Sequence, residues 1–169
     1  GDDANGEVVS PANLNAPGQV VIAGAKGAVA RAGVRAKELG ARRVVPLPVS
    51  APFHCALMAP AQLRLKADLR ALVVSDPKIP VVANVDAEEK RTAEAAINAL
   101  IQQVSAPVQW EAVVRRLSSL GVHTYVEVGP GTVLSGLIRK TDRKANITSV
   151  GTPADLASFE KMISTETLE

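Results

Sequence analysis

His54 is the side chain of this sequence best suited to acid–base chemistry. It lies in residues 50–55 (SAPFHC), directly after an apolar run and just before a stretch with helical spacing. Histidine changes its charge near neutral pH, so it can take up and return a proton there. Catalytic groups favour such connectors, because a rigid scaffold fixes a loop side chain that still reaches a ligand. A structural interpretation stays open, since a histidine at a strand end often only satisfies a polar contact.

The possible partners of His54 are few. Cys55 is adjacent, but neighbouring residues of an extended chain point apart, which disfavours a Cys–His nucleophile pair. A Gly-x-Ser-x-Gly elbow does not occur in the sequence, so a serine activated by His54 would have to lie outside this chain. Gln102 and Gln103 end a predicted helix, where unpaired carbonyls could accept a hydrogen bond from an imidazole nitrogen.

A glycine-containing loop at residues 127–136 (EVGPGTVLSG) follows a predicted strand and precedes a predicted helix. It fails the phosphate-loop pattern, because Leu137 and Ile138 occupy the positions of Lys and Ser or Thr. It also fails the dinucleotide pattern, since Leu134 replaces the third glycine. We therefore predict a tight strand-to-helix turn. His123 falls inside the preceding strand and is interpreted as structural.

Composition narrows the function classes. The 169 residues are 47% apolar, and the net charge of +2 gives no reason to expect nucleic acid or a membrane surface as a partner. One cysteine excludes an internal disulfide, and with two histidines it excludes the usual four-ligand zinc site. No apolar run approaches the roughly 20 residues that span a bilayer, and no signal peptide is recognised, so we expect a cytoplasmic protein.

Hydrophobic periodicity predicts strands that alternate with helices. A hairpin is expected from strands at 7–15 and 19–23 with a turn at 16–18. Further strands are expected at 44–49, 79–85, 122–128 and 147–150. Helices are expected at 26–39, 60–73, 93–104, 107–121, 133–140 and 155–163. This alternation favours an α/β fold with a mostly parallel sheet covered on both faces. The first elements resemble the last two-thirds of a split βαβ unit whose opening strand and helix would precede Gly1.

Four segments together carry a family resemblance: residues 10–24 (SPANLNAPGQVVIAG), 47–54 (LPVSAPFH), 103–110 (QVSAPVQW) and 127–131 (EVGPG) with Leu134, Gly136 and Leu137. In this order and spacing the chain resembles the C-terminal part of malonyl-CoA:acyl carrier protein transacylase. It is more distantly similar to the acyltransferase domains of polyketide synthases.

The resemblance implies a fold and a domain division. Residues 51–169 would form the C-terminal part of an α/β-hydrolase-like acyltransferase domain. Residues 1–50 would form most of a small ferredoxin-like α+β subdomain that lacks its N-terminal strand and helix.

The resemblance also implies roles for five residues. His54 matches the catalytic histidine, and Gln103 matches the position whose backbone carbonyl holds that histidine in its working tautomer. Asn13 and Asn15 match asparagines that border the thioester channel. Phe53 matches the residue whose bulk favours malonyl over methylmalonyl, because a phenyl ring would crowd a branching methyl group.

The implied reaction is transfer of a malonyl group from malonyl-CoA to the phosphopantetheine thiol of acyl carrier protein, by a Ser–His ping-pong mechanism without cofactor or metal. The family's serine, its malonyl-binding arginine and an oxyanion donor belong to a region that precedes Gly1, so the missing N-terminal part of the enzyme is an expected partner. Loss of a nucleophile removes about 10⁶ in rate, and we expect this chain alone to be inert. Two alternatives are a non-catalytic fragment that binds carrier protein or CoA, and an acyltransferase unit of a polyketide synthase.

Overall fold

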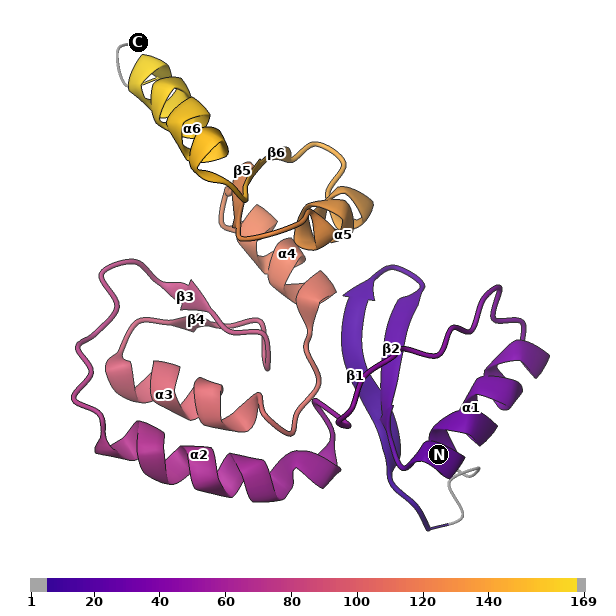
Figure 1. The fold of residues 1–169 in the computed structure, drawn as a ribbon. Coiled ribbons are helices and arrows are strands. Elements are labelled where there is room, and N and C mark those ends of the chain that lie inside the picture. The colour runs from indigo at the N-terminus through magenta and orange to yellow at the C-terminus, as the bar shows by residue number, and fades with distance from the viewer. Residues whose placement is uncertain (1–5, 167–169) are drawn as a thin grey trace. The chain divides into compact units, whose positions relative to one another are not determined.

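The computed structural model describes residues 6–166, with side chains to residue 160, so the outermost ends of the two predicted domains lie outside the described residues. The chain divides into two compact units, Gly1–Val113 and Val114–Glu169. Figure 1 labels the elements of both units. The predicted domain boundary at residue 50 is a different division and stays a prediction.

The first unit begins with the predicted hairpin, which is confirmed. Strands β1 (Val9–Ala16) and β2 (Gln19–Gly24) pair antiparallel, with Pro11 opposite Ile22 and the register shifting on either side of residues 13–14. Gly18 in the connecting turn has φ 73°, the left-handed conformation that glycine adopts without strain.

Helix α1 (Lys26–Glu38) follows the hairpin and contacts both of its strands (Figure 1). Its Ala28 is fully buried. The helix ends as the sequence indicates: Gly40 has φ 94°, and Ala41 N–H donates to the carbonyl of Ala36 at 2.9 Å. This is the closing hydrogen bond of a Schellman-type C-cap.

The predicted strand at residues 44–49 is wrong. The segment has no strand assignment, and Val45, Leu47 and Val49 are each more than half exposed. Pro46 and Pro48 have no N–H groups, so the segment lacks two donors that a β-ladder would need. Its apolar composition is that of a strand, but it cannot form the hydrogen bonds of one. His54 therefore follows an irregular segment instead of a strand end.

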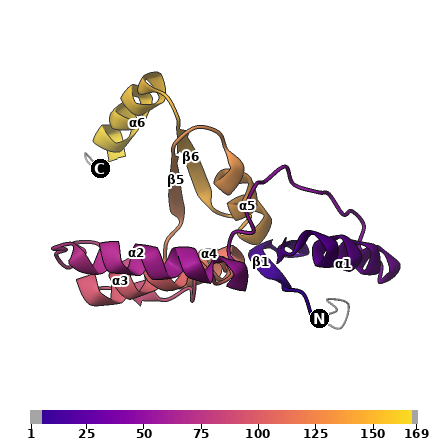
Figure 2. The same cartoon turned by 60° about the horizontal axis from the view of Figure 1, so that its bottom comes forward.

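The helical hairpin of the first unit consists of α2 (Ala59–Ala71) and α3 (Ala93–Gln102), which lie side by side (Figures 1 and 2). A short 3-10 turn, η2 (Ala56–Met58), precedes α2. Between the helices, β3 (Val81–Val82) and β4 (Glu89–Lys90) form a two-residue antiparallel pair, so the strand predicted over 79–85 is much shorter than expected.

The amphipathic face of α3 explains its packing. Ile97, Ala99 and Ile101 are buried. Ile97 and Ile101 are four residues apart and share one face of the helix, whereas Ala99 lies on another side. Thr92 caps the N-terminus, since its hydroxyl accepts a hydrogen bond from Ala95 N–H at 3.2 Å. Helix α4 (Trp110–Ser119) follows and contains the division between the two units, with Val113 and Val114 buried.

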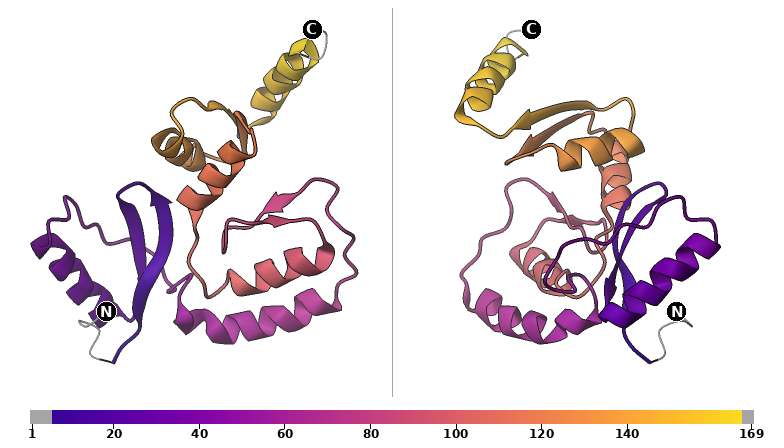
Figure 3. Two further views of the ribbon diagram at one scale, coloured as in Figure 1. Left: turned by 180° about the vertical axis from the view of Figure 1, so that it is seen from behind. Right: turned by 45° about the vertical axis from the view of Figure 1, so that its right-hand side comes forward.

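The second unit is a βαβ arrangement followed by a helix: β5 (Thr124–Val128), α5 (Val133–Thr141), β6 (Asn146–Val150) and α6 (Pro153–Glu166). Strands β5 and β6 pair parallel in register, and α5 contacts both of them (Figure 3). The buried residues of the second unit include Tyr125 of β5 and Leu137 and Ile138 of α5.

The expectation of one mostly parallel sheet requires correction. The described strands form three separate two-stranded pairings, of which only β5–β6 is parallel. Alternation of strands and helices identifies the elements, but pairing is decided by contacts distant in sequence that periodicity does not encode. The α/β class itself stands.

Within residues 6–166, no helix is long and apolar enough to cross a membrane. The same residues contain no group of three or more His, Cys, Asp or Glu side chains placed to hold a metal ion.

Candidate active site

His54 lies in a tight connector and has an unusual backbone conformation. Its φ of 61° is in the left-handed region, which costs a residue with a Cβ roughly 1–2 kcal/mol. The connector is closed by Cys55, whose buried thiol donates to the carbonyl of Pro52 at 3.1 Å. The carbonyl of Cys55 then accepts from Met58 N–H at 2.9 Å and begins η2. Strained backbone persists where surrounding contacts determine it, and such sites are often functional.

Gln103 supplies the hydrogen-bond partner of His54. It follows the last turn of α3, with its N–H bonded to the carbonyl of Ala99 at 3.0 Å. In a continuing helix the carbonyl of Gln103 would accept a hydrogen bond from the N–H four residues later. That residue is Pro107, which has no N–H, so the carbonyl is available to another donor. His54 Nδ1 lies 2.9 Å from that carbonyl oxygen. The structure thus places His54 within hydrogen-bonding distance of a carbonyl at the helix end that the sequence indicated.

This contact fixes which ring nitrogen of a neutral His54 carries the proton. A carbonyl oxygen only accepts, so the Nδ1–H group must be the donor. The lone pair is then on Nε2, on the opposite side of the ring from Gln103. The imidazole is half-buried, and in this state it can take a proton from an acidic group presented to Nε2.

The segment after Gln103 is anchored at several points that the sequence reasoning did not single out. Val108 N–H donates to the carbonyl of Ala12, and Leu14 N–H donates to the carbonyl of Val108, both at 2.8 Å. The side-chain amide of Gln109 donates to the carbonyl of Val85 at 2.6 Å. The segment that follows Gln103 is therefore bonded to both β1 and the β3–β4 turn. The only sequence signal for these residues was their presence in a matched segment.

The other three predicted site residues lie in the same unit. Asn13 forms an isolated parallel bridge with Val108, so it flanks the anchored segment. Asn15 is two residues further along β1, and both asparagines are half-buried. Phe53 precedes His54 and is 52% exposed. The structure records no direct hydrogen bond from Asn13, Asn15 or Phe53 to the His54–Gln103 pair among the described residues.

Cys55 does not form a pair with His54, as expected. Its thiol is 1% exposed and is directed to Pro52, which leaves it neither accessible nor aimed at the imidazole. His123 is exposed just before β5, and its carbonyl accepts from Asn146 N–H at 2.8 Å.

The glycine loop of the second unit is a strand-to-helix turn, as predicted. Glu127 accepts hydrogen bonds at the start of α5 from Leu134 N–H at 2.9 Å and Ser135 N–H at 2.8 Å, and from the Ser135 hydroxyl at 2.5 Å. The hydroxyl contact, followed by the backbone contacts, lowers the pKa of Glu127 below its usual value despite opposing desolvation. A carboxylate thus occupies the helix N-terminus at which a phosphate would otherwise bind.

No protein-family model matches the sequence. The chain is 46% identical over 157 residues to the malonyl CoA-acyl carrier protein transacylase of Salmonella typhimurium, covering 93% of this chain and 51% of that protein. It is 43% identical over 148 residues to the transacylase of the same name from Bacillus subtilis, with 88% and 47% covered.

Solved structures give the same result. The crystal structure of an acyl carrier protein S-malonyltransferase from Vibrio cholerae matches with a TM-score of 0.89 and 47% identity, covering 94% of this chain and 52% of that one. A type II polyketide acyl carrier protein in complex with its malonyl-transacylase matches with a TM-score of 0.89 and 44% identity, covering 93% and 51%.

The fold and these likenesses define part of an α/β acyltransferase domain. The chain spans about half the length of the curated relatives it matches. In sequence and in fold the chain is similar to the malonyl CoA-acyl carrier protein transacylases, and these likenesses are consistent with a C-terminal part of that enzyme.

Proposed function

We propose that His54 is the general base of a malonyl transfer from malonyl-CoA to the phosphopantetheine thiol of acyl carrier protein. The observation that carries this proposal is the 2.9 Å contact between His54 Nδ1 and the carbonyl of Gln103. It orients the ring and leaves Nε2 free to act, which is the part that a carboxylate plays in a Ser–His–Asp triad.

The proposed reaction has two half-reactions with the same proton path. In the first, Nε2 of His54 takes the proton of a serine hydroxyl as that oxygen attacks the thioester carbonyl of malonyl-CoA. The carbon–sulfur bond breaks, and the CoA sulfur receives the proton from His54. In the second, His54 takes the proton of the phosphopantetheine thiol, whose sulfur attacks the serine ester and releases the serine oxygen with the proton. No cofactor or metal takes part in this scheme.

The serine, and an arginine that pairs with the malonyl carboxylate, would be supplied by the remaining part of the enzyme. On this proposal the chain alone is inert in transfer, because removing a nucleophile costs about 10⁶ in rate. A cytoplasmic location, expected from the sequence, belongs to the same proposal.

Substrate contacts are proposed for three further residues. Asn13 and Asn15 would border the channel for the thioester arm. Both lie on β1, the strand to which the segment after Gln103 is bonded. Phe53 would limit the space next to the α-carbon of the acyl group. Its exposed ring and its position beside His54 support this role.

The proposal is tested by combining this chain with the complementary half of the Salmonella typhimurium relative and measuring transfer of labelled malonyl to carrier protein. We expect His54→Ala to lower the transfer rate by about 10²- to 10⁴-fold, the usual contribution of a general base. His123→Ala is the matched control and should stay within a few-fold of the unsubstituted protein. Equal rates for the His54→Ala and unsubstituted proteins would overturn the assignment.

The same assay separates the alternatives. A combined protein that binds carrier protein or CoA but transfers nothing, with or without His54, would indicate a binding fragment. Preference for a polyketide carrier protein over a fatty-acid one would indicate a polyketide acyltransferase unit.

A further inference from the structure

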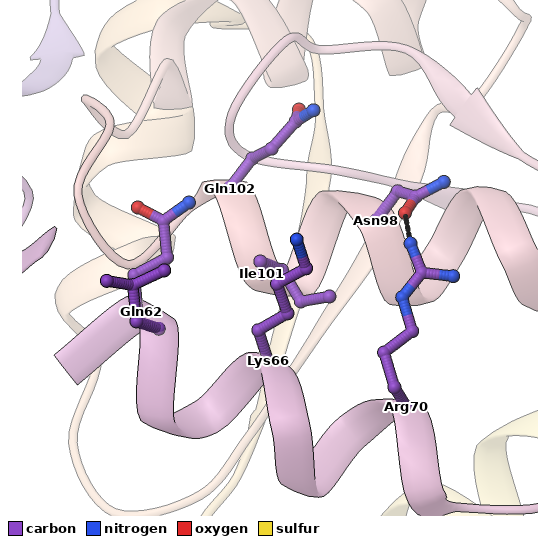
Figure 4. A pocket seen from close by; sticks show the side chains of 7 residues that line it. Gln62, Lys66, Arg70, Asn98, Ile101 and Gln102 are labelled. Carbon is purple, nitrogen blue, oxygen red and sulfur yellow. Dashed lines mark hydrogen bonds between the residues drawn. The ribbon is translucent and has the colours of Figure 1, made fainter. Parts of the chain in front are cut away.

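The described part of the first unit contains a groove between α2 and α3 that the transfer reaction does not use. Its volume is about 260 Å³. Gln62, Lys66 and Arg70 line it from α2, and Asn98, Ile101 and Gln102 line it from α3 (Figure 4). We call it the α2–α3 groove.

The sequence places these polar side chains together. Positions 62, 66 and 70 are four residues apart, and positions 98, 101 and 102 are three and four apart, so each set occupies one face of its helix. Seams between packed helices are ordinarily apolar. Here Lys66 and Arg70, one turn apart, extend from α2 toward α3, on which Ile101 is buried (Figure 4).

The hydrogen bonds at both ends of the groove engage amide oxygens. The carbonyl oxygen of Asn98 accepts from an Nη2 of Arg70 at 2.5 Å. The carbonyl oxygen of Gln62 accepts from the hydroxyl of Ser105. An amide has one oxygen and one NH₂ group, so both side chains keep their NH₂ donors for another partner. The remaining groups of the groove favour an acceptor.

The charge of the groove also favours a negatively charged acceptor. Lys66 and Arg70 contribute two positive charges, and among the described residues no carboxylate lines the groove. Asp68 lies two positions from each cation, and residues two apart on a helix do not share a face. A phosphate group carries a charge of about −1.5 to −2 at neutral pH and accepts several hydrogen bonds. It therefore matches two neighbouring cations and an amide donor better than a singly charged carboxylate does.

We propose that the α2–α3 groove is a binding site for a phosphate-type oxyanion, held by Lys66 and Arg70, which are one turn apart, with the NH₂ group of Gln62 or of Asn98 as a further donor. The proposal does not depend on the transfer function. The groove nevertheless borders the candidate site, because Gln102 lines it and the next residue, Gln103, holds His54. The phosphate could be inorganic or part of a nucleotide, and both present the same chemistry to the groove.

The test is a titration of the ¹⁵N-labelled chain followed by NMR, in a phosphate-free buffer at constant ionic strength. Inorganic phosphate, adenosine 3′,5′-diphosphate and acetate are added separately. We expect saturable shifts of the side-chain NH₂ signal of Gln62 or of Asn98 with both phosphate compounds. Tighter binding of the adenosine compound would identify a nucleotide source, and equal binding would identify free phosphate. Absence of saturation with both, or equal shifts with acetate, would overturn the proposal.

Two substitutions in α2 distinguish a specific binding site from general electrostatic attraction to a basic helix. Lys66→Gln removes one charge from the groove, whereas Arg64→Gln removes one charge from the same helix outside the groove lining. Loss of a charge-assisted hydrogen bond should weaken phosphate binding about tenfold or more for Lys66→Gln. The Arg64→Gln protein should stay within about twofold, because exposed charges at a distance are screened. Equal weakening by both variants would refute a specific site. The titration of the unsubstituted chain tests the proposal independently of whether either variant folds.

Discussion

The backbone of His54 leads to a prediction about stability in which the usual ranking of glycine and alanine reverses. At φ 61° a residue with a Cβ is strained, and glycine is not. Both His54→Ala and His54→Gly remove the imidazole and its hydrogen bond to Gln103, so their difference isolates the backbone. We expect the His54→Gly protein to be the more stable of the two.

The magnitude follows from two opposing quantities. Relief of left-handed strain contributes about 1–2 kcal/mol in favour of glycine. The larger conformational freedom of glycine in the unfolded chain costs about 0.4–1 kcal/mol. The net preference for glycine at position 54 is therefore about 0.8 kcal/mol, within a range of about 0–1.6 kcal/mol. In the exposed helical position Arg64, which lies in the middle of α2, glycine should instead be less stable than alanine by about 1 kcal/mol.

The assay is urea unfolding of four proteins: the glycine and alanine variants at positions 54 and 64. With a slope of about 1–3 kcal/mol per molar urea, the two glycine–alanine differences should have opposite signs and be separated by about 0.5 M or more in midpoint. Equal slopes within each pair would show that the two variants expose similar surface on unfolding, so that their midpoints can be compared directly. The reasoning is refuted if glycine lowers the midpoint at both positions by similar amounts.

Three further predictions concern other contacts of the structure. The pKa of Glu127 is held below its usual value of 4.5, mainly by the hydrogen bond from the Ser135 hydroxyl. The ionised Glu127 therefore stabilises the folded state. This stabilisation is complete above pH 4.5 and is lost as the pH falls through the lower pKa of the folded state. Glu127→Gln should therefore flatten the acid limb of a plot of urea midpoint against pH, and an unchanged limb would contradict the cap. Gln103→Ala keeps the backbone carbonyl, so His54 should remain protonated at Nδ1 in ¹⁵N NMR spectra of the imidazole, and a proton on Nε2 would show that the side chain mattered. Phe53→Ala, in the combined transferase, should raise the ratio of methylmalonyl to malonyl transfer by about tenfold or more, since one methylene in a pocket is worth about 1–3 kcal/mol; an unchanged ratio would remove Phe53 from the substrate pocket.

The local features of the fold were predictable because local signals encode them. Pro17 and Gly18 define the hairpin turn, and Gly40 ends α1 as its position after an amphipathic run indicates. The helix end at Gln103 was also predictable, and Pro107 explains why its carbonyl is available. The prediction failed at residues 44–49 because Pro46 and Pro48 remove ladder donors. It failed in the sheet because an extended apolar run does not specify its hydrogen-bonding neighbour.

The sequence singled out the two residues that the structure brings into contact, but not the geometry of their contact. Matched segments identified His54 and Gln103, whereas the left-handed backbone of His54 has no counterpart in the composition of SAPFHC. The anchoring of Val108 and Gln109 to separate elements is likewise a property of the folded chain. Periodicity identifies which face a side chain occupies, but not which carbonyl it meets across the unit.

The strain at His54 is small enough for its immediate contacts to sustain. A left-handed non-glycine residue costs roughly 1–2 kcal/mol, and an ordinary hydrogen bond contributes about 1 kcal/mol net. Two contacts flank the residue: the weaker hydrogen bond from the Cys55 thiol to Pro52 inside the connector, and the bond from the imidazole to Gln103. Together they are of the same order as the strain. Because the second bond is made by the imidazole itself, the histidine helps to hold the backbone conformation that presents its own Nε2.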